Sequence, residues 1–199
     1  MIRTAIFLGF TIFPIFSQVT APVEVVNSGV AAVNDLGAEV VKGKFACLYE
    51  RMNPQWRTKL AEKIGGEEKL RQQCESAGAV LAKNATTITR LAATGFPTVF
   101  EVSPGKKESI VDGKKVETLI YTQWLLFVPT ITHLQIVGDD GIHTVESRSF
   151  QVAISPKSEL RWTFIDGATT SIAELRNLFI SLPVNVTLPK QEKKLLEQK

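Results

Sequence analysis

Two charged residues in one predicted strand are the first candidates for chemistry. Glu146 and Arg148 share a face of the strand expected near 142–154, together with Phe150 and the apolar residues after it, because alternate residues of a strand point the same way. An apolar face points inward, so we expect Glu146 and Arg148 to line an open end of the core. There an arginine binds carboxylate or phosphate, and a desolvated glutamate acts as a base. The alternative is that water surrounds both side chains.

Tyr121 and Gln123 are the second pair of candidate binding residues. They share a face of the strand expected over 115–128, whose two faces are both apolar, as in a covered central strand. Tyr121 then either lines a pocket or is a half-buried aromatic residue with a satisfied hydroxyl.

Metal and cofactor chemistry has little support in the sequence. His133 and His143 flank the turn at Asp139–Gly141, where a metal site is one interpretation and a chance arrangement in a hairpin is the one we favour. The chain contains no phosphate-binding glycine loop, dinucleotide fingerprint, nucleophile elbow or zinc-helix motif. We therefore predict no cofactor, no metal site and no catalytic residue.

The N-terminus predicts export. Arg3 precedes an uncharged apolar stretch over 4–16, and small residues lead up to Ala21, which is the pattern of a secretory signal peptide. The stretch is short for a membrane span, so we expect a periplasmic or secreted protein with no span after cleavage. The alternative is a retained anchor.

Charge and cysteine content add two expectations. The net charge is +3 and charges of both signs are interspersed, so no nucleic-acid partner is predicted. Cys47 and Cys74 are the two cysteines, and an even pair in an exported chain favours a disulfide. The alternative is two separate thiols packed as small apolar residues.

The first part of the chain reads as helices that change direction. After a lead-in over 22–33, apolar residues recur at helical spacing up to Met52. Asn53-Pro54 then ends one helix and begins the next, because a residue before proline avoids helical geometry while asparagine caps and proline suits a first turn. Gly65-Gly66 ends the second helix, and a third is expected over 67–82.

The second part reads as strands joined by tight turns. Strands are expected at 97–103, 115–128, 131–137, 142–154 and 160–166, with hairpin turns at Asp112-Gly113 and Asp139–Gly141. Pro129 predicts a sheet edge or a bulge. A capping box at Ser171–Glu174 begins a short helix. The sequence thus predicts an α+β fold, with N-terminal helices packed on a strongly curved antiparallel sheet, a single domain over 34–182 and a polar tail over 183–199.

This order of elements resembles the nuclear transport factor two-like superfamily. The segments that carry the resemblance are YERMNPQWRTKLAEKIGGEEKL, followed by strands ending in SFQVAISPKSELRWTFIDG and a closing helix. The resemblance implies a cone-shaped sheet around a pocket and makes a homodimer one expected arrangement. It covers roughly 34–182 and implies fold more than function.

The functional expectation is a non-enzymatic exported domain that binds a small apolar ligand or a protein partner in or around that pocket. The alternatives are a pocket enzyme doing general acid–base chemistry, of the isomerase or dehydratase kind, and a purely structural partner domain. A buried, desolvated acid would favour the enzyme, and an empty apolar pocket would favour binding.

The first testable prediction concerns export. When the chain is produced in a secreting host, we expect mass spectrometry to find a mature form that begins at Pro22, lacks Arg3 and has a net charge of 3 − 1 = +2. A full-length mass recovered in the membrane fraction would instead identify the N-terminal stretch as a retained anchor.

Overall fold

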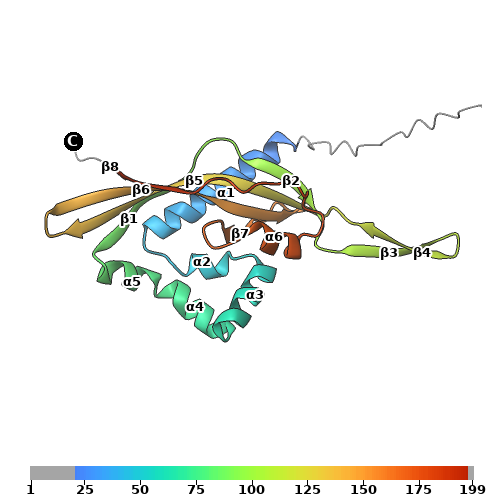
Figure 1. Ribbon diagram of the computed structural model, residues 1–199, viewed down its shortest axis with the longest axis horizontal. Coiled ribbons are helices and arrows are strands. Elements are labelled where there is room, and N and C mark those ends of the chain that lie inside the picture. The colour runs from blue at the N-terminus through green and yellow to red at the C-terminus, as the bar shows by residue number, and fades with distance from the viewer. Residues whose placement is uncertain (1–20, 197–199) are drawn as a thin grey trace, which may run out of the picture.

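A computed structural model describes residues 21–196, so residues 1–20 of the predicted signal peptide lie outside the described part of the chain. The helices are α1 (Val23–Val41), α2 (Cys47–Glu50), α3 (Pro54–Ile64), α4 (Glu67–Glu75), α5 (Ala77–Lys83) and α6 (Ile172–Leu178). The strands are β1 (Thr86–Ala93), β2 (Thr98–Val102), β3 (Lys106–Val111), β4 (Lys114–Leu119), β5 (Gln123–Gly138), β6 (Gly141–Pro156), β7 (Thr163–Asp166) and β8 (Glu192–Leu196). The predicted α+β class is confirmed: helices come first, then a mostly antiparallel sheet and a short helix (Figure 1).

The centre of the sheet is the long antiparallel pair β5–β6. It runs in unbroken register from Gln123 opposite Pro156 to Gly138 opposite Gly141. Strands β1 and β2 both pair with the other edge of β5, and β7 and β8 both pair with the other edge of β6. The tail predicted to be polar therefore contains a sheet strand, β8. Strands β3 and β4 form a separate two-stranded sheet.

Pro129 lies inside β5 without bending it out of the sheet, which differs from the predicted edge or bulge. It pairs with Phe150 on one side. On its other side β1 ends at Ala93 and β2 begins at Thr98, and the Thr94 backbone N–H donates to the Pro129 carbonyl. Proline has no N–H to donate, and it sits where the neighbouring strand changes and no ladder bond is required of it.

Both faces of the central strands are covered. Alternate residues Trp124, Leu126 and Val128 pack with α1 in one buried cluster, while Leu125 and Phe127 pack in a second cluster on the opposite face. Residues of α3, α6 and the segment after α6 complete the second cluster: Trp56, Leu175, Phe179 and Leu182. The sheet is thus the middle of three layers at its centre.

The break at Asn53-Pro54 takes the chain from one face of the sheet to the other. The Asn53 N–H donates to the Phe164 carbonyl, and the Phe164 N–H donates to the Arg51 carbonyl, so the chain runs along the edge of β7 here. The predicted cap is confirmed, since the Asn53 side chain accepts a hydrogen bond from the Trp56 N–H. Cys47, before the break, and Trp56, after it, accordingly lie in different clusters.

Helix α1 begins at Val23, ten positions before its predicted start at Val33. The residues taken as a lead-in, Val25 and Gly29 among them, are buried against the sheet. Gly37 marks the closest approach: a Cβ built there would lie 2.1 Å from the backbone oxygen of Leu91 in β1. Small residues in this helix therefore set the distance between α1 and the sheet.

Gly37→Ala tests that contact. Replacing a helical glycine by alanine ordinarily stabilises by about 1 kcal/mol. Here a rigid backbone atom blocks the methyl group, so we expect the free energy of unfolding to fall by about 2 kcal/mol in urea denaturation. The neighbouring exposed residue provides the control, since Ala38→Ser is expected to stay within about 0.5 kcal/mol of the parent. A Gly37→Ala protein more stable than the parent would contradict the contact.

Candidate functional site

Glu146 and Arg148 lie together on β6, as predicted, in a cross-strand row of charged groups. The pairing places Arg90, His133, Glu146 and Lys194 side by side on β1, β5, β6 and β8. The Arg148 Nε donates to Glu146 Oε1 at 2.8 Å, and His133 Nε2 lies 3.4 Å from the other carboxylate oxygen. The side chain of Glu146 is 12% exposed and that of Arg148 is 55% exposed, so the row lies at the surface and not in a closed pocket.

The electrostatics of this row oppose acid–base chemistry. The hydrogen bond from Arg148 holds the pKa of Glu146 below its usual value, and the neighbouring His133 adds to the effect. A carboxylate whose charged form is stabilised is a weak base, whereas a catalytic base needs its pKa raised toward neutral pH. The row is a good anchor for sheet register and a poor general base.

Tyr121 and Gln123 lie away from this row. The predicted strand over 115–128 is wrong as a single element, since β4 ends at Leu119 and β5 begins at Gln123. Tyr121 falls in the connection between them and is 47% exposed. Gln123 pairs with Pro156 at one end of the β5–β6 pair, whereas Glu146 pairs with His133 towards the other. The four predicted binding residues therefore do not form one site.

The two histidines point to opposite faces of the hairpin. His133 is opposite Glu146 and His143 is opposite Ile136, and positions separated by an odd number of residues face opposite ways. His143 instead bonds Asp140 in the turn at 2.7 Å. Among residues 21–196, no group of three His, Cys, Asp or Glu side chains is arranged to hold a metal ion.

The predicted disulfide between Cys47 and Cys74 is wrong, since both thiols are free. Cys47 is buried in the cluster beneath α1, and Cys74 lies on α4, whose buried residue is Leu70. Burial, with the nearby Glu39 adding to it, raises the pKa of Cys47 to about 11, so this thiol stays protonated and unreactive at neutral pH. Cys47 is therefore a core packing residue, whereas Cys74 is partly exposed.

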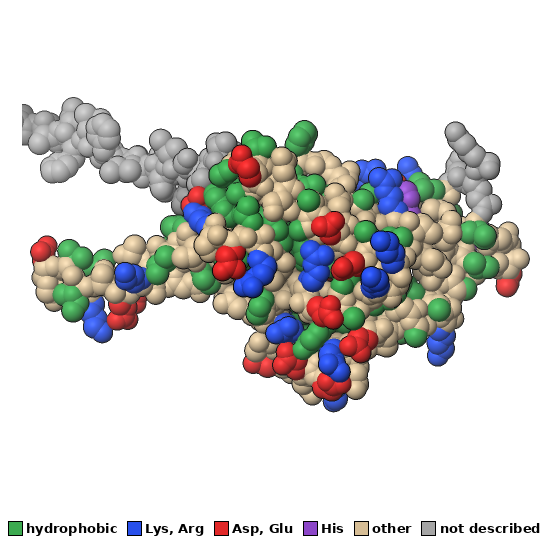
Figure 2. All heavy atoms as spheres, turned by 180° about the vertical axis from the view of Figure 1, so that it is seen from behind, with side chains coloured by type: hydrophobic (Ala, Val, Ile, Leu, Met, Phe, Trp, Pro, Cys, Tyr) green, Lys and Arg blue, Asp and Glu red, His purple; other side chains and the backbone are tan. Residues whose placement is uncertain are grey.

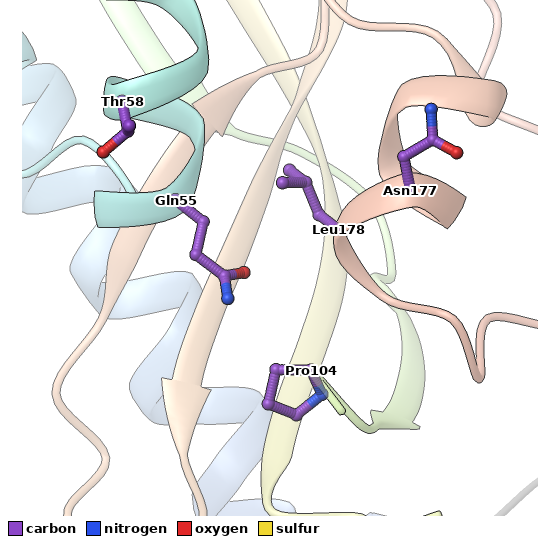
Figure 3. A pocket seen from close by; sticks show the side chains of 5 residues that line it. All are labelled: Gln55, Thr58, Pro104, Asn177 and Leu178. Atoms are coloured by element: carbon purple, nitrogen blue, oxygen red, sulfur yellow. The ribbon is translucent and has the colours of Figure 1, made fainter. Parts of the chain in front are cut away.

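A shallow open groove of about 340 Å³ separates α3 from α6. Gln55 and Thr58 of α3 line one side, Asn177 and Leu178 of α6 the other, and Pro104 closes the end (Figure 3). Gln55 and Leu178 point into the gap from opposite sides (Figure 3). Amide and hydroxyl groups there can donate and accept hydrogen bonds, but these five residues carry no titratable group.

One carboxylate joins the two helices beside this groove. Glu174 of α6 accepts a 2.7 Å hydrogen bond from Lys63 and lies 3.5 Å from Lys59, both on α3. It also completes the predicted capping box with Ser171, which is confirmed. The hydrogen bond from Lys63 is the largest influence on the pKa of Glu174, which falls to about 2. These ion pairs, which we call the clasp, connect α3 to α6 beside the groove.

The β3–β4 ribbon, which we call the arm (Lys106–Leu119), projects away from the three layers (Figure 1). Its strands pair only with each other among the described strands. It carries apolar side chains that water reaches: Ile110 is 76% exposed, and Val111 and Val116 are also exposed. Apolar and charged side chains are interspersed on its surface (Figure 2). The sequence indicated a hairpin turn at Asp112-Gly113. It did not indicate that the arm ends at Leu119, because the predicted strand ran on to residue 128.

Charges on the arm are only partly matched. Glu108 and Glu117 lie directly opposite each other, an arrangement that like charges make unfavourable. Diagonal lysines offset it, since Lys106 bonds Glu117 and Lys115 lies 3.5 Å from Glu108. One face, with Lys107, Lys114, Val111 and Val116, carries no acidic group.

Comparisons with protein-family models, curated proteins and solved structures find no match to this chain. Within residues 21–196, no helix has the length and apolar character required to cross a bilayer.

Glu174→Gln tests the clasp between α3 and α6. The pKa of Glu174 is lowered in the folded state, so its ion pairs stabilise the fold above pH 4.5 and lose their effect as the pH falls from about 4.5 to about 2. We expect the variant to be about 1 kcal/mol less stable at pH 7, allowing for solvent screening. The difference from the parent should shrink towards pH 2 in thermal melts. Glu62→Gln, an exposed change on α3, is the control; a constant difference at all pH values would refute the clasp.

Proposed function

We propose that this protein is an exported, non-enzymatic protein-binding domain and that the arm is its contact surface. The single observation that carries the proposal is the arm itself: a ribbon that leaves the folded body and exposes Ile110, Val111 and Val116 to water. A partner that covers these side chains would gain the free energy of burying apolar surface.

The physical state of the arm supports this choice. An isolated two-stranded ribbon is marginally stable in water, and its outer edges present unpaired backbone donors and acceptors. Proteins ordinarily protect such edges, while binding proteins use them to add a strand from a partner. Lysines on the arm give it some protection against unspecific pairing, which fits a contact that forms with a chosen partner.

The alternative of a small apolar ligand has weaker support. Large side chains fill the space between the sheet and α1, where the resemblance implies a pocket: Trp124, Trp162 and Phe164 are all buried there. The groove between α3 and α6 is open and partly polar. The resemblance to the nuclear transport factor two-like superfamily stays a prediction.

The alternative of a pocket enzyme also has weaker support. The acid that sequence analysis singled out, Glu146, is ion-paired with Arg148 and has a lowered pKa, which is the opposite of what a general base requires. The protein-binding proposal relies on no such residue.

Removal of the arm tests the proposal. The Ser103 hydroxyl bonds both Gly105 and Ile120 at the base of the arm, so a short Gly-Ser link from Gly105 to Ile120 can replace residues 106–119 without opening the body. We expect the shortened protein to keep its stability within about 0.5 kcal/mol, because β3 and β4 pair with no other strand in the described part of the chain.

The readout is quantitative mass spectrometry of proteins co-purified from the native host. The parent should retain partners that the shortened protein loses. A full-length variant with Ile110→Thr and Val116→Thr separates the loss of apolar contact from the loss of arm length. Equal retention by all three proteins would refute the proposal.

A further inference from the structure

We infer that the partner of the arm is a second copy of this chain, joined through the outer edge of β4 about a twofold axis at Val116. The inference rests on the proposed function of the arm. It follows from the order of charges along β4 and from which backbone groups face outward.

The hairpin register decides which residues of β4 can pair outward. Asp112 and Gly113 form a two-residue turn, with Val111 opposite Lys114 and Ser109 opposite Val116. In such a hairpin the pair that flanks the turn is hydrogen-bonded, and hydrogen-bonded pairs then alternate along the ladder. The backbone groups of Val116 therefore point at β3, while those of Lys115 and Glu117 point to the free edge.

An antiparallel contact between two β4 strands can be centred on Val116. Lys115 then exchanges both backbone hydrogen bonds with the partner's Glu117, and Glu117 does the same with the partner's Lys115. Opposite charges face each other in both places, which favours a pair of neighbouring strands. Val116 meets the partner's Val116 as a non-hydrogen-bonded pair, the kind in which side chains approach most closely.

Other centres on the free edges lack this complementarity. A centre on Lys115 or on Glu117 places each residue opposite its own copy, so that like charges meet. A centre on Lys114 does the same with another lysine. On β3, a centre on Ser109 places Glu108 opposite Ile110 and Lys107 opposite Val111, which forms no ion pair. Among these centres, only the one on Val116 places each charged residue beside the axis opposite a residue of the other sign.

The contact also relieves the unfavourable pair within the arm. Glu117 faces Glu108 in its own ribbon, and the partner's Lys115 would supply a cation on its other side. Four strands then form one sheet in which each Glu117 lies between Glu108 of its own arm and a lysine of the other arm. The isologous contact is closed, so it yields a dimer and not a fibre.

The reach of the arm permits this arrangement. Each strand has six residues, about 20 Å at the usual rise per residue. Pairing about Val116 brings the tip at Gly113 to Leu119 of the partner subunit, so the two bodies lie at opposite ends of the shared sheet. The paired segment is short and lies well below the size of a permanent interface. We therefore expect a dimer that forms at micromolar concentrations and above.

The test uses two charge reversals on the full mature chain, each measured by sedimentation velocity across a concentration series. Lys115→Glu places a glutamate opposite the partner's Glu117 twice per dimer, and Glu117→Lys places lysines opposite each other in the same way. Each variant alone should dimerise at least about tenfold more weakly than the parent. An equimolar mixture should recover the parent's affinity, because both contacts are then complementary.

Lys107→Glu is the matched control, since it reverses one charge on the arm but lies on β3, away from the proposed seam. It should leave the dimer unchanged within about twofold. A parent that stays monomeric, or a mixture that dimerises no better than either variant alone, would overturn the second-copy inference. In that case the protein-binding proposal would still stand if the shortened protein lost the partners that co-purify with the parent. If the shortened protein kept those partners, the protein-binding proposal would fail as well.

Discussion

The β5–β6 pair is the constraint on which the rest of the structure depends. In part of this pair, apolar side chains lie on both faces of the sheet. Leu125 points to one face and Leu126 to the other. A sheet that is apolar on both faces must be covered on both. The chain meets this demand with α1 on one side and with α3 and α6 on the other, so helices that are close in sequence have to reach opposite faces.

The Asn53-Pro54 break is the solution to that problem. Hydrogen bonds that Phe164 exchanges with Arg51 and Asn53 hold the chain along the edge of β7 while it crosses between the layers. The same bonds cover an edge that would otherwise be open to unwanted pairing. A single dipeptide thus ends a helix, caps the next helix and protects the sheet.

Side chains fill both faces of the sheet at its centre, so the proposed binding surface lies at the periphery. Aromatic side chains occupy the space between α1 and the sheet, and the charged row at Glu146 holds four strands in register near the surface. Ion pairs at Glu174 fix α6 against α3 in a similar way. The carboxylates of Glu146 and Glu174 have cationic partners within the protein. Among residues 21–196, by contrast, the strands of the arm pair only with each other, and the arm exposes apolar side chains. The arm is for this reason the surface that a partner is most able to complete.

The sequence by itself determined the cap at Asn53, the capping box at Ser171 and the hairpin at Asp112-Gly113, because each depends on residues within one turn or one helix end. It also determined the α+β class, because helical spacing in the first part of the chain gives way to strand patterns in the second. Periodicity also placed Glu146 and Arg148 on one face of their strand. Tertiary structure decided what lay beyond that range. Val25 and Gly29 lack a strong helical signal, yet they belong to α1 and are buried against the sheet. Cys47 and Cys74 are an even pair of cysteines, yet they lie in different helices and both thiols are free. The sequence predicts one strand over 115–128, and only the pairing of β4 with β3 and of β5 with β6 separates an arm from a core strand. Local sequence determines which backbone conformations have low free energy. Burial and pairing between strands that are far apart in the chain then select one of them.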